Sequence, residues 1–258
     1  MDSIIKKFTS DDEAYYSDYS FVTNSQLGVL NRSPATYQYY KDNPSHRPVT
    51  KALNFGRAFH MCMLEHDKFE SDVVVEPNVN KRTKSGKEEY SKFLALHDSK
   101  TILSNDEQDS LVGMRNRLTS SSEAMELLSG GLAEQVNIWN DPTHHVPCKG
   151  KADYYNKEKN ILVDIKTTQD ASPKGFRSSA YKYAYDRQSA FYLDGFEVDE
   201  FWFIVIEKSA PYNLGIYKCS LDFLDEGREK YSTLLETYSY YFIQKLFKPY
   251  EHSFSGTL

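Results

Sequence analysis

Two carboxylates and a lysine lie close enough along the chain to do chemistry together. The stretch Pro147–Thr168 holds two runs rich in apolar and aromatic residues, split by turn-forming residues at 156–160, a pattern typical of a β-hairpin. Asp164 and Lys166 are two positions apart on the second run, so in a strand they project from one face, roughly 6–7 Å apart. Asp153, near the end of the first run, lies across from them if the hairpin closes.

This group of side chains could bind a divalent cation. Converging carboxylates supply the oxygen ligands that Mg²⁺ or Mn²⁺ prefers, and a nearby lysine can polarise or deprotonate a water. The alternative is an ordinary exposed hairpin with a cross-strand ion pair. An Asp-x-Lys pattern after an apolar run does not by itself separate the two, so the surrounding chain has to decide.

Composition restricts how the chain could meet a polyanion. The 258 residues suffice for one domain with a sizeable core. Tyrosine is abundant, with 20 Tyr against 2 Trp, and its amphipathic ring suits half-buried surfaces and contacts with bases or sugars. The net charge of -6 excludes binding of nucleic acid by bulk charge, so a local basic lining would be needed.

The cysteines and the chain start indicate an intracellular protein. Cys62, Cys148 and Cys219 are far apart, odd in number and without metal-ligand spacing, which favours reduced thiols over a zinc site or a disulfide framework. The first residues turn acidic at once, unlike a secretory signal, and no apolar run approaches transmembrane length. We expect a soluble, cytoplasmic protein with no membrane partner.

The N-terminal part is predicted to be an arm over residues 1–24, either poorly ordered or docked, followed by helices. A helix should begin near Ser25 and give way to a second at Pro34, which suits a first helical position. Arg32 and Ser33 at this start could hold a phosphate. Simple helix capping is the alternative, and the pattern favours it.

A histidine marks the next predicted helix, Lys51–Glu65. Leu53, Gly56 and Leu64 recur with His60 at helical spacing, which places the imidazole on the apolar side. A lone histidine on such a face is usually a satisfied core residue.

A basic loop is predicted at Asn78–Lys87. Its Lys81, Arg82 and Lys84 could contact a phosphate backbone, although such a run is more often a solvated loop.

The period changes from helical to alternating in the second half. Two helices are expected over 88–128, and a strand at Ala133–Trp139 that carries Glu134, whose face the alternation does not fix. A helix at Pro173–Asp194 would place Gln188 and Tyr192 on one face. The last predicted elements are strands at Phe201–Ile206 and Ile216–Cys219 and a helix at Ser220–Phe247.

This order of elements predicts an α+β or mixed α/β fold in a single domain, 1–258. Its parts would be the arm at 1–24, a mostly helical part at 25–130, a catalytic sheet and helix at 131–219, and a C-terminal helix and tail at 220–258.

Four motifs together resemble the PD-(D/E)XK nuclease superfamily. P-C-K-G-K-A-D-Y-Y and I-L-V-D-I-K-T-T are similar to its paired motifs, with Asp153 as the first acid and Asp164-Ile165-Lys166 as (D/E)-x-K. G-R-A-F-H-M-C-M-L-E resembles the histidine helix of the RecB-like and RecE-like (exonuclease VIII) branches, and Q-S-A-F-Y resembles their Q-x-x-x-Y motif. In addition to these four, S-P-A-T-Y is similar to the start of RecE-like and phage exonucleases. The first motif departs by lacking a proline before the acid.

The resemblance implies a central mixed β-sheet flanked by helices, of restriction-endonuclease type, and a Mg²⁺-dependent (or Mn²⁺-dependent) deoxyribonuclease. It further implies a 5′-to-3′ double-strand DNA exonuclease acting in recombination or repair. One or two ions would be held by His60, Asp153, Asp164 and the Ile165 carbonyl, and on weaker grounds by Glu134. Lys166 would position or deprotonate the attacking water, and Gln188 and Tyr192 would orient the lysine or contact substrate.

Partners follow from the same resemblance: double-stranded DNA ends, a homo-oligomeric ring around the duplex, and a single-strand annealing protein. The resemblance also implies a bacterial or phage-infected host cell. One alternative is a structure-specific or Cas4-like nuclease, against which the three badly spaced cysteines argue, because a Cas4-like iron–sulfur cluster needs four. Another is a non-catalytic DNA-binding module of the same fold, against which the intact acids and lysine argue.

Overall fold

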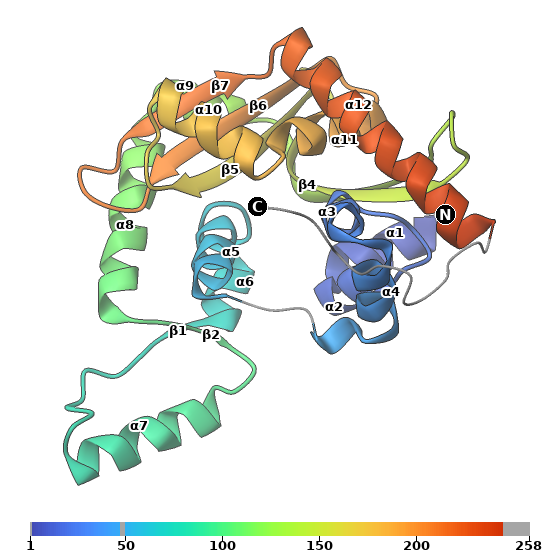
Figure 1. The fold of residues 1–258 in the computed structure, drawn as a ribbon. Coiled ribbons are helices and arrows are strands. Elements are labelled where there is room, and N and C mark those ends of the chain that lie inside the picture. Colours follow the sequence, from blue (N-terminus) through green and yellow to red (C-terminus); the bar gives the residue numbers. More distant parts are fainter. Residues whose placement is uncertain (1, 47–49, 245–258) are drawn as a thin grey trace, which may run out of the picture.

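The computed structural model describes residues 2–46 and 50–244 (Figure 1). A five-stranded sheet in the order β3-β4-β5-β6-β7 organises the chain. Its strands are β3 (Leu132–Asn140), β4 (Pro147–Asn156), β5 (Ile161–Thr168), β6 (Glu200–Glu207) and β7 (Leu214–Lys218). Neighbours are antiparallel except for β5 and β6, which are parallel. The predicted hairpin and mixed α/β fold are therefore confirmed.

The crossover between the parallel strands consists of two helices, α10 (Pro173–Lys182) and α11 (Tyr185–Phe196). A parallel pair requires such a connection. The single helix predicted at Pro173–Asp194 is wrong, because Ala184 has a left-handed backbone with φ 54° and such a residue cannot continue a right-handed helix. The break lets each helix pack separately on the sheet.

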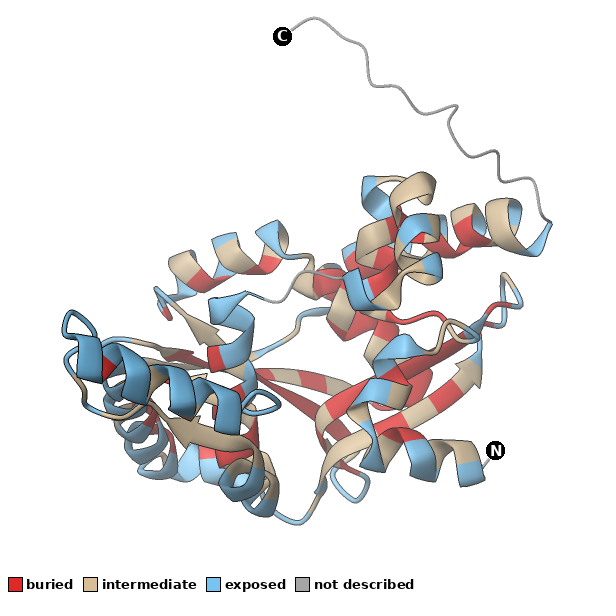
Figure 2. Ribbon diagram, turned by 90° about the horizontal axis from the view of Figure 1, so that it is seen from below, coloured by how far each residue is buried: buried red, intermediate tan, exposed pale blue. Residues whose placement is uncertain are grey.

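Alternation along β5 divides the core into two halves. Val163 and Ile165 pack on one face with α5 (Lys51–Leu64), α8 (Asn105–Thr119) and α9 (Ser122–Leu127). Leu162 packs on the other face with α10 and α11. Buried positions accordingly run along the strands, whereas many helices keep one exposed side (Figure 2). β5 is thus covered on both faces, as its apolar run predicts.

The N-terminal segment is docked on the sheet. Its helices are α1 (Asp2–Ser10), α2 (Asp12–Ser17), α3 (Asn24–Arg32) and α4 (Pro34–Asp42), followed by the short 3-10 helix η1 (Pro44–His46). Phe8 and Tyr15 are buried against Val136 and Ile138 of β3. Of the two predictions for this arm, the docked one is confirmed and the poorly ordered one is wrong, because these aromatic side chains find an apolar face of β3.

The C-terminal helix α12 (Leu221–Tyr238) packs with α3 in a third apolar cluster. It continues into the π-helical turn η2 (Ser239–Ile243). The start of the predicted helix Ser220–Phe247 is confirmed, and its end lies outside the described residues.

A smaller unit extends from the body, with α6 (His66–Asp72), β1 (Val73–Val75), α7 (Lys84–Leu96) and β2 (Thr101–Leu103) (Figure 1). β1 and β2 pair in parallel, and β2 was not predicted.

The predicted helix ending at Leu128 is divided into α8 and α9, because the Ser121 side chain caps a new start. None of the helices in the described part of the chain is both long and apolar enough to cross a bilayer.

Candidate metal centre

The two hairpin acids lie where β4 and β5 separate. The last cross-strand pair of this ladder is Tyr154 with Val163, so the next positions along, Asp153 and Asp164, are free of strand pairing to each other. The Asp153 Oδ2 oxygen accepts a hydrogen bond from the Ile165 amide at 2.9 Å. The Asp153 carboxylate thus occupies the opening and fixes the backbone of β5.

His60 on α5 contacts the same point from the neighbouring helix. Its Nδ1 lies 3.3 Å from Asp153 Oδ2, and its Nε2 lies 2.6 Å from the Ile165 carbonyl oxygen. The predicted helical face was wrong in one member, because Leu53 is 61% exposed while Phe59 is buried. His60 therefore stands at the border of the buried face, where it reaches the strand ends.

Glu134 completes a three-residue group with His60 and Asp153. Each offers one ligand atom, and these atoms lie within 4.8 Å of one another. Within residues 2–46 and 50–244, this is the only group of histidine, cysteine or acidic side chains gathered closely enough for a metal. It brings together α5, β3 and β4.

The backbone at Glu134 is unusual for a strand. Its φ is 52°, a region that costs a non-glycine residue roughly 1–3 kcal/mol. Ala133 pairs with Tyr154 and Gln135 with Ala152, but the pair between them is missing. On β4, opposite Glu134, the side chains stop alternating regularly between the two faces of the sheet. Ala152 packs with α11, whereas Tyr154, two positions on, packs with the cluster on the opposite face. Sequence alternation could not place Glu134 because the alternation changes at this position.

Asp164 lies beside this group and is held from the α11 side. Lys166 Nζ is 2.6 Å from Asp164 Oδ2, and Gln188 Nε2 donates to Asp164 Oδ1 at 2.6 Å. Lys166 also stands over the Tyr185 ring, 4.8 Å from its centroid. Tyr185 was not predicted, because nothing in local spacing links it to a lysine on another element.

Burial and neighbouring charges shift the pKa values of the buried acids and of His60. Burial, and then the charge of Asp153, raises the pKa of Asp164 to about 6 and that of Glu134 to about 7. Burial alone would lower the pKa of His60, but the Asp153 carboxylate outweighs it and raises that pKa to about 9. Burial would raise the pKa of Asp153, yet His60 holds it below its usual value. Burial and repulsion by Asp153 thus outweigh the neighbouring cations at Asp164 and Glu134.

The donor set fits a hard divalent cation. Carboxylate oxygens, one imidazole and a main-chain carbonyl suit Mg²⁺ or Mn²⁺ better than a thiolate-seeking metal. A bound cation would also favour the ionised forms of Asp164 and Glu134, whose pKa values are raised in its absence.

Tyr192 has a different environment from Gln188. It packs beside Phe191 and Phe196 on α11, and a side chain at Gly150 of β4 would stand 3.2 Å from its ring. These contacts pack the ring against the strand that carries Asp153. Burial, and then the charges of neighbouring groups that include Asp164 and Asp153, raise the pKa of the Tyr192 hydroxyl.

The predicted DNA-binding residues are not gathered at this group. Ser33 caps α4 by accepting a hydrogen bond from the Thr36 amide at 3.0 Å, which confirms capping, and Arg32 is exposed nearby. Lys81 pairs with Glu76 at 2.6 Å. The three basic residues Lys81, Arg82 and Lys84 lie at or just before the start of α7, which stands off from the five-stranded sheet (Figure 1). All three are exposed.

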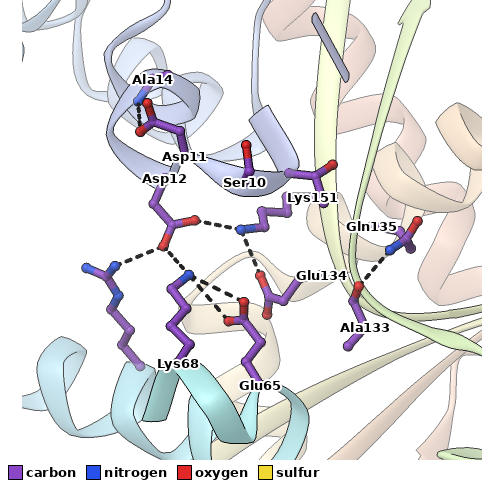
Figure 3. Close-up of polar contacts among 12 residues, drawn as sticks. Ser10, Asp11, Asp12, Ala14, Glu65, Lys68, Ala133, Glu134, Gln135 and Lys151 are labelled. Carbon is purple, nitrogen blue, oxygen red and sulfur yellow. Dashed lines mark hydrogen bonds and ion pairs between the residues drawn. The ribbon is translucent and has the colours of Figure 1, made fainter. Parts of the chain in front are cut away.

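A polar network next to Glu134 was not predicted (Figure 3). Asp12 of α2 accepts contacts from Arg57 at 2.8 Å, Lys68 at 2.9 Å and Lys151 at 2.6 Å. Lys151 also lies 3.0 Å from Glu134 Oε2. These partners lie 45 to 139 positions from Asp12 in the chain, so no local sequence pattern predicts the contacts.

A solved structure shares this fold. A candidate exonuclease from Eubacterium rectale superposes with a TM-score of 0.61 at 13% identity, over 93% of this chain and 91% of that one. An alkaline exonuclease from Laribacter hongkongensis gives 0.39 at 11% identity, over 91% and 97%. A phage-related exonuclease from Haemophilus somnus 129PT gives 0.34 at 14%, over 66% and 91%. The two lower scores add nothing to the fold assignment.

No match was found among curated proteins. The model of a family described as "PDDEXK-like domain of unknown function (DUF3799)" matches residues 23–250, which include all four motifs. The resemblance to PD-(D/E)XK proteins is thereby confirmed, and the chain belongs to the DUF3799 family of PDDEXK-like domains.

Proposed function

We propose that this protein is a divalent-metal-dependent deoxyribonuclease that degrades double-stranded DNA from an end. The observation that carries the proposal is the convergence of His60, Glu134 and Asp153 within 4.8 Å, where β4 and β5 part. Asp164 pairs with Lys166 and interacts electrostatically with Asp153 and His60 of this group. The fold shared with the Eubacterium rectale candidate exonuclease is consistent with this activity.

His60, Glu134 and Asp153 would hold one or two Mg²⁺ or Mn²⁺ ions, and Asp164 and the Ile165 carbonyl would complete the ligand set. Such an ion polarises a phosphoryl oxygen and lowers the pKa of a water. Asp153 already accepts from the Ile165 amide, so one side chain both offers a ligand oxygen and fixes the strand that carries Asp164. Gln188 orients the Asp164 carboxylate through its amide.

Lys166 would act as a positive charge more than as a base. Burial would lower its pKa, but the charges of Asp164 and Asp153 raise it above its ordinary value. The ammonium therefore stays protonated near neutral pH, and it can donate to a water or stabilise charge on the pentacovalent phosphate.

The acidic chain would hold DNA through local contacts. Arg32, Arg82 and Lys84 are exposed cations that could contact the duplex backbone. A homo-oligomeric ring with a basic bore would keep a protein of net charge -6 on its substrate. The 5′-to-3′ direction, a role in recombination or repair and a single-strand annealing partner are proposed from the family resemblance.

A digestion assay tests this function. Linear, nicked and circular duplexes carrying 5′-phosphate or 5′-hydroxyl ends, labelled at either end, are incubated with Mg²⁺, with Mn²⁺ and with EDTA. We expect loss of linear duplex from its 5′ ends, intact circles and no reaction in EDTA. Folded protein that cleaves no duplex with either metal would contradict the proposal, and cleavage of closed circles would replace it with an endonuclease.

A further inference from the structure

The N-terminal helix α2 is tied to β4 by two lysines of that strand. Lys149 Nζ donates to the main-chain carbonyls of Tyr15 and Asp18 at 2.7 and 3.0 Å, near the C-terminal end of α2. Lys151 Nζ contacts Asp12, at the other end of α2. Residues two apart share a strand face, so both lysines reach the same helix. Both are buried.

Only the second of these lysines also contacts the candidate metal centre. Lys151 Nζ lies between Asp12 Oδ1 at 2.6 Å and Glu134 Oε2 at 3.0 Å (Figure 3). Asp12 is itself held by Arg57 of α5 and Lys68 of α6 through its other oxygen, Oδ2. Asp12 thus fixes where the Lys151 ammonium stands.

The charges around Asp12 show what its loss would do. Arg57, Lys68 and Lys151 face three carboxylates in this network, those of Asp12, Glu65 and Glu134. Without the Asp12 charge, three cations would share two carboxylates. Lys151 would then pair more closely with Glu134 and compete with a metal ion for it.

We infer that Asp12 is a positioning residue of the metal centre, acting through Lys151 on Glu134. α2 is accordingly part of the active centre as well as a packing element. Groups that orient metal ligands typically change metal affinity by 10–100-fold when they are removed. This inference rests on the proposed metal-dependent function and adds to it a specific role for the N-terminal helix.

The test measures Mn²⁺ affinity by titration calorimetry on the full chain, with melting temperature recorded for each variant. Asp12→Asn keeps the shape of the side chain and removes its charge, and we expect it to weaken Mn²⁺ binding about tenfold. Lys149→Met is the matched control, because it releases the same helix from the same strand without touching Asp12 or Glu134. We expect this control to bind Mn²⁺ within about twofold of wild type.

A double variant separates an effect through Glu134 from general loosening. Glu134→Gln should itself weaken Mn²⁺ binding, and adding Asp12→Asn to it should weaken binding no further, because the affected ligand is already lost. In the single Asp12→Asn variant, DNA cleavage should recover at saturating Mn²⁺, as expected of a residue that positions a ligand.

The outcomes distinguish this inference from the function beneath it. Wild-type protein that neither binds Mn²⁺ nor cleaves DNA would overturn both. Wild-type protein that does both, with unchanged affinity in Asp12→Asn or an equal loss in Lys149→Met, would overturn the role of Asp12 alone.

Discussion

Two neighbouring charge clusters, both reached by β4, differ in how their charge is balanced. Around Asp12, three cations meet three acids. Burial would raise the pKa of Asp12, but hydrogen bonds from Lys151 and Lys68 hold it well below its usual range. Around Asp153, where Glu134 is shared with the first cluster, burial and repulsion between the acids outweigh the neighbouring cations, and the pKa values of Asp164 and Glu134 rise to about 6 and about 7.

The difference separates a structural cluster from a functional one. A carboxylate whose pKa is lowered by its neighbours stabilises the fold, whereas a buried carboxylate with a raised pKa costs stability when ionised. Such a cost is tolerated where the site has another use for the charge, and we propose that binding a divalent cation is that use here. The predictions below challenge this contrast, beginning with the largest effect.

Removing an acid from the unbalanced cluster should abolish activity and spare the fold. We expect Asp153→Asn to lower Mg²⁺-dependent DNA cleavage by about three orders of magnitude or more, because a metal ligand is lost while the hydrogen bond from the Ile165 amide can persist. Cleavage rates and melting temperature are measured together. A variant that degrades DNA at the wild-type rate would show that the cluster is not the active site.

The same contrast predicts that folding stability depends on pH with opposite signs for Asp164 and for Asp12. In metal-free buffer, its pKa of about 6 in the folded state exceeds the ordinary 3.8, so between these pH values the folded protein binds more protons than the unfolded one. Stability from this group therefore falls as pH rises through the window. Relative to wild type, Asp164→Asn should gain roughly 5 °C or more in melting temperature from pH 4 to pH 7.

Thermal melts across that pH range test the sign. Asp225→Asn is the control, because its carboxylate is exposed and pairs with Arg228 far from the cluster. If the difference in melting temperature between Asp164→Asn and wild type stays constant with pH, the ionised Asp164 carboxylate does not destabilise the folded protein.

The smallest effect is expected in the balanced cluster. Arg57 is half-exposed and is one of three cations on Asp12, so Arg57→Met should cost about 1 kcal/mol or less. Chemical denaturation measures this change. A loss several times larger would show that the three contacts with Asp12 stabilise the fold cooperatively. The comparison of the two clusters would then have to include that cooperativity.

The sequence predicts most of the frame and the strand-borne part of the site. Alternating apolar residues and turn-forming residues predict β4 and β5, and hydrophobic spacing predicts α5 with His60. These features depend on neighbours within a few positions, where periodicity and turn chemistry operate. The family resemblance then links His60 to Asp153 across the chain.

The remaining features depend on contacts that local patterns do not encode. Glu134 faces the site because its backbone turns left-handed, a state that glutamate does not favour. The break between α10 and α11, where Ala184 is left-handed, has no glycine or proline to predict it. Asp12 meets Lys151 from 139 positions away, and a lysine in a strand predicts no particular partner.

The hydrogen bonds at Ile165 come entirely from its main chain. Its amide binds Asp153, its carbonyl meets His60, and its aliphatic side chain is buried among the residues under α5. No exchange of side chain at this position, apart from proline, can delete those polar contacts. Variation there acts on the ligands only by moving the backbone. The packing of one aliphatic side chain in the protein interior therefore controls how the acids are positioned.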